Sequence, residues 1–201
     1  MEKTLRIRPM RHEDLLPIVA LHKKTMMSPG SVLGPAYLIP FYQTLLDHPL
    51  VNRLFIAEKE GRIVGFITAT ADLAQTNAYF PLPFFVRLIP RILFLWVTGK
   101  IDPIRLIRHR TLTRKALKLE SPYPTILTLA VSHDFQRRGI GSLLLNAVCL
   151  EIPKLGFQSL YVDTHHTNVA AIKFYRRNGF IPCLSFTDNL ILLRTFSKKQ
   201  F

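Results

Sequence analysis

The feature that most constrains the fold of this chain is the stretch from Thr125 to Leu145, where a strand pattern gives way within a few residues to a helical one. Residues 125–131 are apolar and β-branched, as in a buried strand, and the leucines and alanine further on recur at helical spacing. Gly139 and Gly141 lie between the two patterns. The sequence therefore predicts a strand, a tight turn and a helix.

The same turn has the features of an anion-binding site. The first N–H groups of a helix have no partner within it and lie at the positive end of the helix dipole, so phosphate binds there. The glycines let a phosphate oxygen approach the main chain, and Arg137 and Arg138 add positive charge. The turn has neither the Gly-Lys-Ser/Thr ending of a P-loop nor the Gly-x-Gly-x-x-Gly spacing of a dinucleotide fold, which excludes both classes.

Two motifs resemble those of a known family. The spacing Gln-x-x-Gly-x-Gly at residues 136–141, after a strand ending at Val131, resembles the acyl-CoA signature of the GNAT N-acyltransferases. The run at residues 168–180 resembles that family's second signature and follows at about the right distance. The resemblance extends from about Leu5 to Phe196.

The resemblance implies a fold of the α/β (α+β) class with a GNAT-type mixed, mostly antiparallel central sheet flanked by helices. We expect one domain over residues 1–201, with an apolar and basic insert, helical in part, at residues 72–121 between the third and fourth strands. The order strand, helix, strand, helix favours a right-handed crossover, so the strands beginning near Thr125 and Phe157 should run parallel. In the resembled family this pair splays apart at its carboxyl ends, and the thioester arm lies in the gap.

The hydrophobic pattern also predicts the individual elements. We expect helices from about His12 to Thr25, over the region 36–46 and over 167–178, with a break near Ser28 and a kink or division at Pro40. Four prolines should likewise divide the insert: Pro81, Pro83, Pro90 and Pro103. The expected strands cover residues 4–8, 51–58, 63–71, 125–131, 157–163, 180–186 and 189–196.

The resemblance further implies acetyl-CoA as cosubstrate and a set of residues that contact it. One face of the last predicted helix presents a polar anchor, a small residue and a phenol at i, i+3 and i+7, which are Asn168, Ala171 and Tyr175. The implied cofactor-binding residues are Leu129, Ala130, Val131, Gln136, Arg137, Arg138, Gly139, Ile140, Gly141, Ser142, Asn168, Ala171 and Phe174.

The expected activity is N-acetyl transfer to a primary amine by direct attack, without a covalent enzyme intermediate. Backbone N–H groups near residues 129–131 would polarise the thioester carbonyl, as in the family, and Tyr175 would protonate the leaving thiolate. The alternative for Tyr175 is a helix aromatic that only packs. No single general base stands out among the candidates Asp72, His133, Asp163 and His165.

No bound metal is expected, because the histidines and acids match no zinc-site spacing. Two cysteines do not make a disulfide framework, and neither an apolar leader nor an apolar run of membrane-spanning length is present, so a cytoplasmic location is expected, with membrane association as a further alternative. The net charge of +14 favours an anionic partner without choosing one. Nucleic acid is disfavoured, since no DNA- or RNA-reading motif accompanies the arginines.

The insert at residues 72–121 leaves three alternatives open. It forms a cap over the domain or a homodimer contact, a hydrophobic wall for the acceptor or an acyl chain, or a membrane-surface contact, because basic residues beside Phe, Trp and Leu suit an interfacial helix. For the whole chain, the rivals to N-acetylation are transfer of a longer acyl group or to a lipid-like acceptor, and a non-catalytic acyl-CoA-binding or adaptor module. The amine acceptor itself is not identified by the sequence.

Overall fold

The computed structural model describes residues 5–100, 102, 122–186 and 188–196 and is built around a seven-stranded sheet in the order β1-β2-β3-β4-β5-β7-β6. Within the described residues β4 and β5 are parallel and every other neighbouring pair is antiparallel. This confirms the predicted mixed, mostly antiparallel sheet. The strands are β1 (Arg6–Pro9), β2 (Asn52–Lys59), β3 (Arg62–Thr70), β4 (Thr125–Val131), β5 (Ser159–His165), β6 (Ile181–Phe186) and β7 (Asn189–Thr195).

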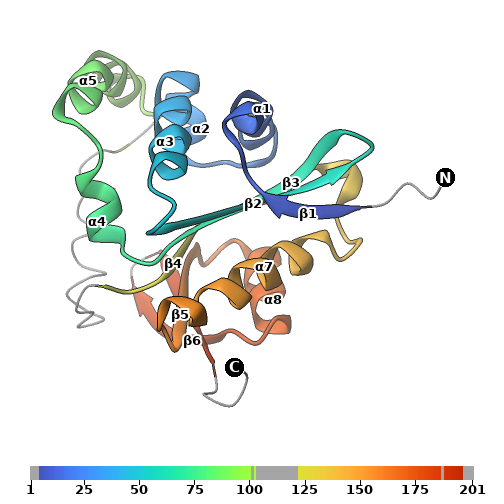
Figure 1. Ribbon diagram of the computed structural model, residues 1–201. Coiled ribbons are helices and arrows are strands. Elements are labelled where there is room, and N and C mark those ends of the chain that lie inside the picture. The colour runs from blue at the N-terminus through green and yellow to red at the C-terminus, as the bar shows by residue number, and fades with distance from the viewer. Residues whose placement is uncertain (1–4, 101, 103–121, 187, 197–201) are drawn as a thin grey trace.

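Helices cover both faces of this sheet (Figure 1). In the view of Figure 1, α1, α2, α3 and α5 lie above it and α7 and α8 below it. The described α-helices are α1 (Leu15–Thr25), α2 (Pro29–Leu33), α3 (Pro35–Asp47), α4 (Leu73–Ala78), α5 (Leu82–Val97), α7 (Ile140–Glu151) and α8 (Val169–Arg177), and the short 3-10 helices are η1 (His12–Asp14), η2 (His133–Phe135) and η3 (Pro153–Leu155).

Each face of the sheet has its own hydrophobic core, because successive residues of a strand point to opposite faces. On the α1–α3 face, Ile56 and Phe66 pack with Tyr42 of α3. On the α7–α8 face, Ile67 and its neighbours pack with Leu144 of α7 and with α8. Alternation along β2 and β3 thus builds both layers from the same two strands.

The predicted hairpin between β2 and β3 is present. Its turn residues Glu60 and Gly61 both have positive φ, 54° and 71°, as a two-residue turn of the I′ type requires. The expected break near Ser28 is present, because α1 ends at Thr25 and the short α2 begins at Pro29 with the Ser28 side chain as its N-cap. A division at Pro40 is not present, because this proline lies inside an undivided α3.

The described part of the insert is helical, as expected, and consists of α4 and α5. Pro81 caps α5 and Pro83 lies in its first turn, but Pro90 lies inside it and does not divide it. Residues 105–118, whose basic and amphipathic sequence is compatible with a helix, lie outside the described residues. None of the helices described has the length and apolar character needed to cross a membrane.

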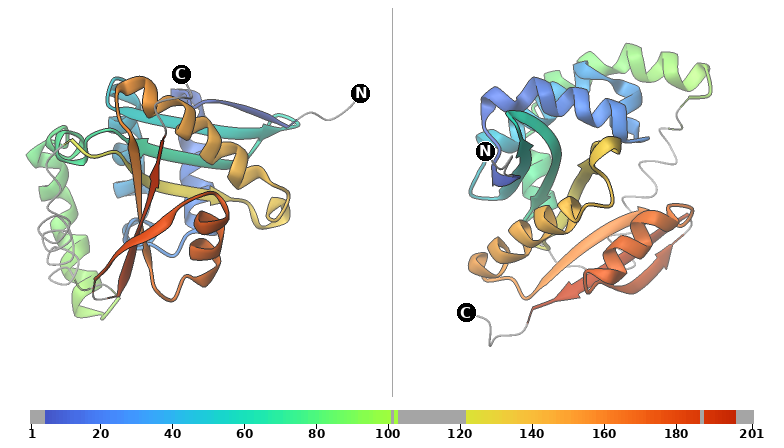
Figure 2. Two further views of the ribbon diagram at one scale, coloured as in Figure 1. Left: turned by 90° about the horizontal axis from the view of Figure 1, so that it is seen from below. Right: turned by 90° about the vertical axis from the view of Figure 1, so that its right-hand side faces the viewer.

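The two halves of the sheet are strongly rotated against one another. In the left view of Figure 2, β1 to β4 run across the picture while β5 and β7 run down it. The change of direction falls between β4 and β5, the parallel pair. This junction positions the site described next.

Candidate active site

The parallel strands β4 and β5 are paired over only a short part of their length. Two pairs join them, Thr125 with Tyr161 and Ile126 with Val162. By contrast β4 stays paired with β3 as far as Val131, and β5 stays paired with β7 along its whole length. Beyond Ile126, therefore, the residues of β4 are not paired with β5 in the described sheet. We call residues 127–131 on the side toward β5 the open edge of β4. The predicted splay is confirmed.

A β-bulge lies where the open edge begins. In the pairing of β3 with β4, Thr68 lies opposite Thr128, but the next residue, Ala69, lies opposite Ile126. Leu127 is therefore the extra residue. A bulge shifts the alternation of backbone groups by one position, so it decides which N–H groups of β4 face β3 and which face the open edge. The sequence prediction did not include this bulge.

The alternation beyond the bulge can be followed from one hydrogen bond. The Ser132 N–H donates to the Val64 carbonyl of β3 at 2.8 Å. Because backbone groups of a strand alternate in direction, the N–H groups of Leu129 and Val131 point the other way, toward the open edge. Two main-chain donors from alternate positions are thus directed into the splay, within the predicted range of residues 129–131.

The turn from β4 into α7 is fixed by one side chain and two left-handed residues. Gln136 Nε2 donates to the Val131 carbonyl oxygen at 3.0 Å and lies 3.3 Å from His133 Nδ1. Arg137 and Gly139 have φ of 59° and 79°. Gln136, predicted to contact the cofactor, therefore closes the turn with its side-chain amide.

Helix α7 begins at Ile140, directly after the predicted glycine turn, with Gly139 as its N-cap. The Leu143 N–H donates to the Gly139 carbonyl at 3.1 Å. The N–H groups of Ile140, Gly141 and Ser142 precede this bond in the first turn, where a helix has no internal acceptors to offer. They form the cradle that the sequence predicts for a phosphate.

Cationic side chains gather beside this cradle. Arg137 and Arg138 are exposed. The Arg138 guanidinium carbon lies 5.5 Å from the centre of the Phe135 ring, and Lys59 Nζ of the β2–β3 hairpin lies 5.6 Å from the same ring. Positive charge from two separate segments therefore lies around Phe135, in the turn that precedes α7.

Gly141 brings the two sequence motifs into contact. A Cβ added to Gly141 would lie 3.1 Å from Phe174 Cε2 on α8, which is tighter than ordinary van der Waals contact. The sequence suggests that Gly141 lets a phosphate approach the main chain, and the structure adds a packing reason for it. Gly139 differs, because a Cβ there would meet nothing within 4 Å and its positive φ is what favours glycine.

The residues of α8 that are predicted to contact the cofactor lie between the N-cap of the helix and the hydrophobic core. Asn168 is exposed and its Oδ1 accepts the Ala171 N–H at 3.1 Å, which makes it the N-cap. Ala171 and Phe174 are half-buried and pack against the core of the α7–α8 face. The predicted polar anchor therefore holds the helix start through its side chain, and Ala171 and Phe174 lie deeper.

Tyr175 is buried, with 6% of its surface exposed. Its ring packs edge-on against Phe174 and Phe180, with centroid distances of 5.1 Å and 5.4 Å. Burial raises the pKa of its phenol above the ordinary value, so the hydroxyl stays protonated. Among the described side chains and backbone groups none accepts or donates a hydrogen bond at this hydroxyl, which is costly for a buried polar group unless another molecule supplies the partner.

Each of the four candidate bases has a local partner. The Asp72 carboxylate caps α4 by accepting from the Ala74 N–H at 2.8 Å. Asp163 accepts from Asn189 at 2.8 Å, and the side chains of His165 and Thr167 are 2.7 Å apart. The fourth, His133, is exposed and lies beside Gln136. In the part of the chain that the structure describes, no three His, Cys, Asp or Glu side chains are grouped as a metal site.

A buried polar chain, which sequence reasoning missed, links α1 to the bulged part of β4. His22 Nδ1 and the Tyr42 hydroxyl are 2.5 Å apart, and the same hydroxyl interacts with the Thr128 side chain. Thr128 and Thr68 hydroxyls are 2.6 Å apart. Burial lowers the pKa of His22 to about 4, so this ring is neutral at pH 7. A histidine among the apolar positions of α1 was the available signal.

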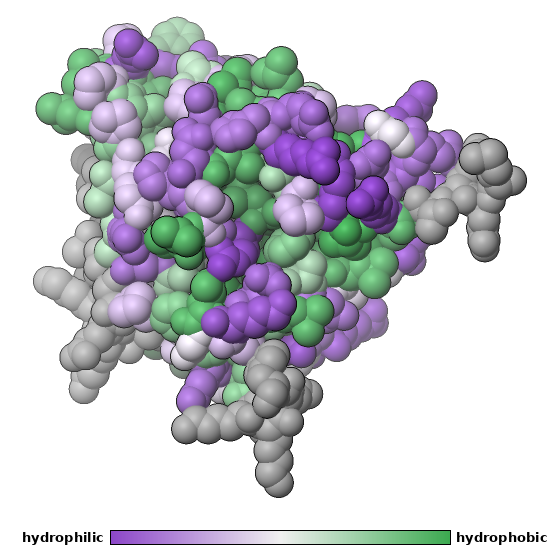
Figure 3. Space-filling model, viewed as in Figure 1, coloured by the Kyte–Doolittle hydropathy of each residue, from purple (hydrophilic) through white to green (hydrophobic). Residues whose placement is uncertain are grey.

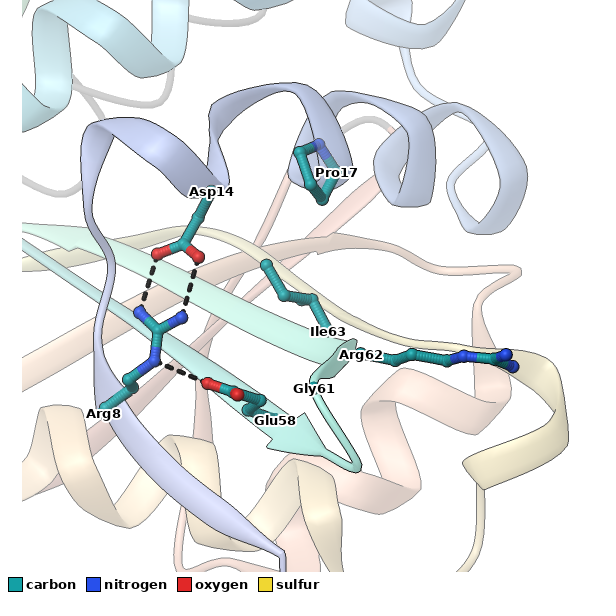
Figure 4. A pocket seen from close by; sticks show the side chains of 7 residues that line it. All are labelled: Arg8, Asp14, Pro17, Glu58, Gly61, Arg62 and Ile63. Carbon is teal, nitrogen blue, oxygen red and sulfur yellow. Dashed lines mark hydrogen bonds and ion pairs between the residues drawn. The ribbon is translucent and has the colours of Figure 1, made fainter.

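A pocket of about 360 Å³ lies elsewhere, between η1, α1 and the β2–β3 hairpin (Figure 4). Arg8 is held there between two carboxylates, with its terminal nitrogens 2.8 Å from the Asp14 oxygens and Nε 2.7 Å from Glu58 (Figure 4). Arg62 points away from these ion pairs. Because the charges inside satisfy one another, the pocket has a structural explanation and is not the candidate site.

Comparison with known proteins assigns this arrangement to a described family. The sequence model of the acetyltransferase (GNAT) family matches residues 18–180. Among curated proteins, the [ribosomal protein bS18]-alanine N-acetyltransferase of Salmonella typhimurium is 39% identical over 56 residues, 28% of this chain and 38% of that protein. The N-alpha-acetyltransferase 30 of Xenopus laevis is 25% identical over 116 residues, 56% of this chain and 40% of that protein. The chain thus spans less than half of either relative.

Solved structures share the fold at low sequence identity. The PaiA N-acetyltransferase of Thermoplasma acidophilum, in complex with coenzyme A, superposes with a TM-score of 0.61 at 13% identity, over 96% of this chain and 99% of that one. The ribosomal-protein-S18-alanine N-acetyltransferase of Escherichia coli superposes with a TM-score of 0.60 at 16% identity, over 98% of this chain and 99% of that one.

Proposed function

The chain belongs to the acetyltransferase (GNAT) family, and on that premise we propose that it transfers an acetyl group from acetyl-CoA to a primary amine by direct attack of the amine on the thioester. Coenzyme A bound to the Thermoplasma protein of the same fold supports acetyl-CoA as the cosubstrate. The names of the curated relatives, both N-acetyltransferases, support an amine as the acceptor.

The observation that carries the proposal is the open edge of β4. The N–H groups of Leu129 and Val131 point into the splay between β4 and β5, and no neighbouring strand of the described sheet uses them. Main-chain donors fixed in this way stabilise the negative charge that develops on a thioester oxygen during attack. They need no reorganisation, because the bulge and the ladder to β3 hold them in place.

The cradle at the start of α7 supplies the second requirement, which is an anchor for the pyrophosphate of the coenzyme. The N–H groups of Ile140, Gly141 and Ser142, together with Arg137 and Arg138, suit an anion of this size and charge. The cradle follows the open edge by one short turn, so a coenzyme held there can extend its thioester arm along β4. Asn168, Ala171 and Phe174 would line the other side of that arm.

Tyr175 is proposed as the general acid. In the reaction the amine nitrogen forms a bond to the acetyl carbon, the carbon–sulfur bond breaks, and the phenol proton passes to the departing thiolate. The new amide nitrogen then loses one of its two protons to solvent, and the phenolate takes one up, so that the amide, the thiol and the neutral phenol remain. Burial raises the pKa of Tyr175, but it raises that of a thiol in the same environment as well, so the two groups stay matched. The hydroxyl without a described partner is the donor that this step needs.

No dedicated base is proposed, because each of the candidates Asp72, His133, Asp163 and His165 is already engaged in a local contact. An amine that arrives deprotonated can attack without one. Since the relatives' names specify a ribosomal protein alanine and an N-alpha group, we place protein N-terminal amines first among acceptors to be assayed. Small amines, amino sugars and lysine side chains follow.

The test combines binding with turnover. Acetyl-CoA titrated into the purified chain should release heat and raise its melting temperature, and Tyr175→Phe should lower kcat about tenfold or more while leaving the Kd for acetyl-CoA unchanged. Tyr79→Phe is a matched control, because Tyr79 stacks on His48 at the far end of β2. Unchanged turnover in Tyr175→Phe would remove the acid role. Binding without transfer to any amine would favour a non-catalytic acyl-CoA-binding module.

A further inference from the structure

Helix α5 exposes an unusual amount of apolar surface. Its buried side carries Leu88 and Leu95, with 5% and 4% of their surface exposed. Eight other large apolar side chains of the helix are between 48% and 85% exposed. These are Leu82, Phe85, Val86, Ile89, Leu93, Phe94, Trp96 and Val97. In Figure 3, hydrophobic residues appear at the upper left, where α5 lies in Figure 1.

The exposed residues form one continuous face. Most follow one another at intervals of three or four along the helix, which places them on the same side. The opposite side is docked on the protein, where Arg91 Nη2 donates to the Val32 carbonyl at 3.0 Å and the Phe84 ring lies 5.8 Å from that of Tyr37. We call the exposed apolar side the outer face of α5. It points away from the helices on which α5 rests, so it does not line the open edge of β4.

The charged residues of α5 and its immediate sequence neighbours are basic. Between Asp72 and Asp102 the sequence contains Arg87, Arg91 and Lys100 and no acidic residue, and Arg91 is the one that lies on the docked side. The net charge of the chain is +14. A helix with Trp, Phe and Leu on one side and basic residues beside them has the composition of helices that lie in a membrane interface.

We propose that the outer face of α5 docks on the surface of an anionic lipid bilayer, with the helix lying parallel to the membrane plane. Charge complementarity favours this occupant, since the basic residues attract anionic headgroups while the apolar side chains enter the acyl boundary. A second copy of the chain is disfavoured by the same charge, because two molecules with net charge +14 repel one another. With 16 residues the helix lies on the bilayer and does not cross it.

The single tryptophan of the chain makes the proposal directly measurable, because Trp96 lies on the outer face and is 48% exposed. Vesicles of phosphatidylcholine with phosphatidylglycerol should shift the Trp96 emission to shorter wavelength and co-sediment the full chain. Vesicles of phosphatidylcholine alone should bind more weakly, and added salt should weaken binding to the anionic ones.

Substitutions localise the effect. The double variant Ile89→Glu, Leu93→Glu should lower vesicle partitioning about tenfold or more, because it removes apolar contact and adds negative charge. Leu16→Glu, Leu150→Glu is the matched control, with two exposed leucines, 65% and 59%, outside α5. All variants are exposed-site changes, and their melting temperatures verify that they fold.

Three results would overturn the proposal. The first is a Trp96 spectrum and a sedimentation profile that anionic vesicles leave unchanged. The second is an equal loss of binding in the control variant, which would mean attraction by overall charge alone. The third is a wavelength shift that depends on protein concentration without lipid and coincides with dimers in analytical ultracentrifugation, which would assign the outer face to a second copy.

Discussion

The two faces of the sheet are stabilised by different kinds of interaction. The core of the α7–α8 face is almost entirely apolar, and its special positions are glycines that fix the turn before α7 or admit the Phe174 ring. The α1–α3 face, by contrast, contains most of the buried polar side chains. These are Asp14, His22, Asn52, Thr68, Thr70, Thr76 and Thr128.

The two faces also differ in how far apart in the sequence their interacting residues lie. The turn between β4 and α7 is built from residues within one short segment. The polar contacts of the α1–α3 face join residues far apart, such as Thr68 with Thr128 and His22 with Tyr42. We therefore expect the α1–α3 face to respond to charge and pH, and the α7–α8 face to respond to small changes of volume and backbone conformation.

The largest effect is expected at the ion pairs of the α1–α3 face. The side chains of Arg8 and Asp14 are 13% and 5% exposed and make two contacts of 2.8 Å. Asp14→Ala leaves the Arg8 guanidinium without its main partner in a buried place, so the free energy of unfolding should fall by about 3 kcal/mol. Glu13→Ala removes a side chain that is 67% exposed and should have little effect in the same urea titration.

The pH dependence of this pair has a definite sign. Burial raises the pKa of Asp14, but hydrogen bonds from the Arg8 side chain and the Arg11 backbone lower it by more, to a value below the ordinary one. A lowered pKa in the folded state gives stability that is present above about pH 4 and is lost as the pH falls through the folded value. The Asp14→Ala difference should therefore shrink in acid. A difference that stayed constant between pH 7 and pH 3 would contradict this account.

The second effect concerns the polar chain around His22. Its folded pKa of about 4 lies below the ordinary value for histidine, so the unfolded state binds a proton first as the pH falls. The free energy of unfolding should consequently decrease by about 2 kcal/mol between pH 7 and pH 4 through this residue alone. His22→Gln should flatten that part of the profile, whereas His12→Gln, whose side chain is 62% exposed, should not. Parallel profiles for all three proteins would show that His22 does not titrate as proposed.

The fold could largely be predicted because its strand and helix patterns are local. The hairpin at Gly61, the parallel pair and the helix after Gly139 follow from neighbouring residues. The continuity of α5 through Pro90 could not be predicted, because a proline inside a helix is expected to divide it. Pro90 lacks an N–H, so the Val86 carbonyl loses its helical partner, but Val86 is 52% exposed and water can replace the bond. A proline on an exposed helix side therefore costs less than the general rule suggests.

The candidate site was predictable to a similar extent and for the same reason. The glycine turn and the face of α8 follow from motif spacing, and burial of Tyr175 follows from its place on that face. The bulge at Leu127 depends on how β4 aligns with β3, which no local pattern in either strand specifies. The chain from His22 to Thr128 requires three segments to meet. Both features come from tertiary pairing and not from local sequence.

The smallest and most specific effects are expected at the two glycines of the α7–α8 face, each changed to alanine. Gly139→Ala has open space but must hold φ near 79°, which should cost about 1 kcal/mol of stability. Gly141→Ala needs no such φ, yet its methyl group must displace the Phe174 ring by a few tenths of an ångström. Gly139→Ala should therefore strain the backbone of the turn, whereas Gly141→Ala should disturb the packing of α7 against α8.

A double-mutant cycle can separate the two mechanisms. Phe174→Leu removes the ring atoms that a Cβ at position 141 would meet. In that background the cost of Gly141→Ala should become smaller, whereas the cost of Gly139→Ala should stay the same, in both the free energy of unfolding and the Kd for acetyl-CoA. If the Gly141 and Phe174 effects added without coupling, the contact between the two motifs would not explain this glycine. The approach of a phosphate to the main chain would then be the better reason for it.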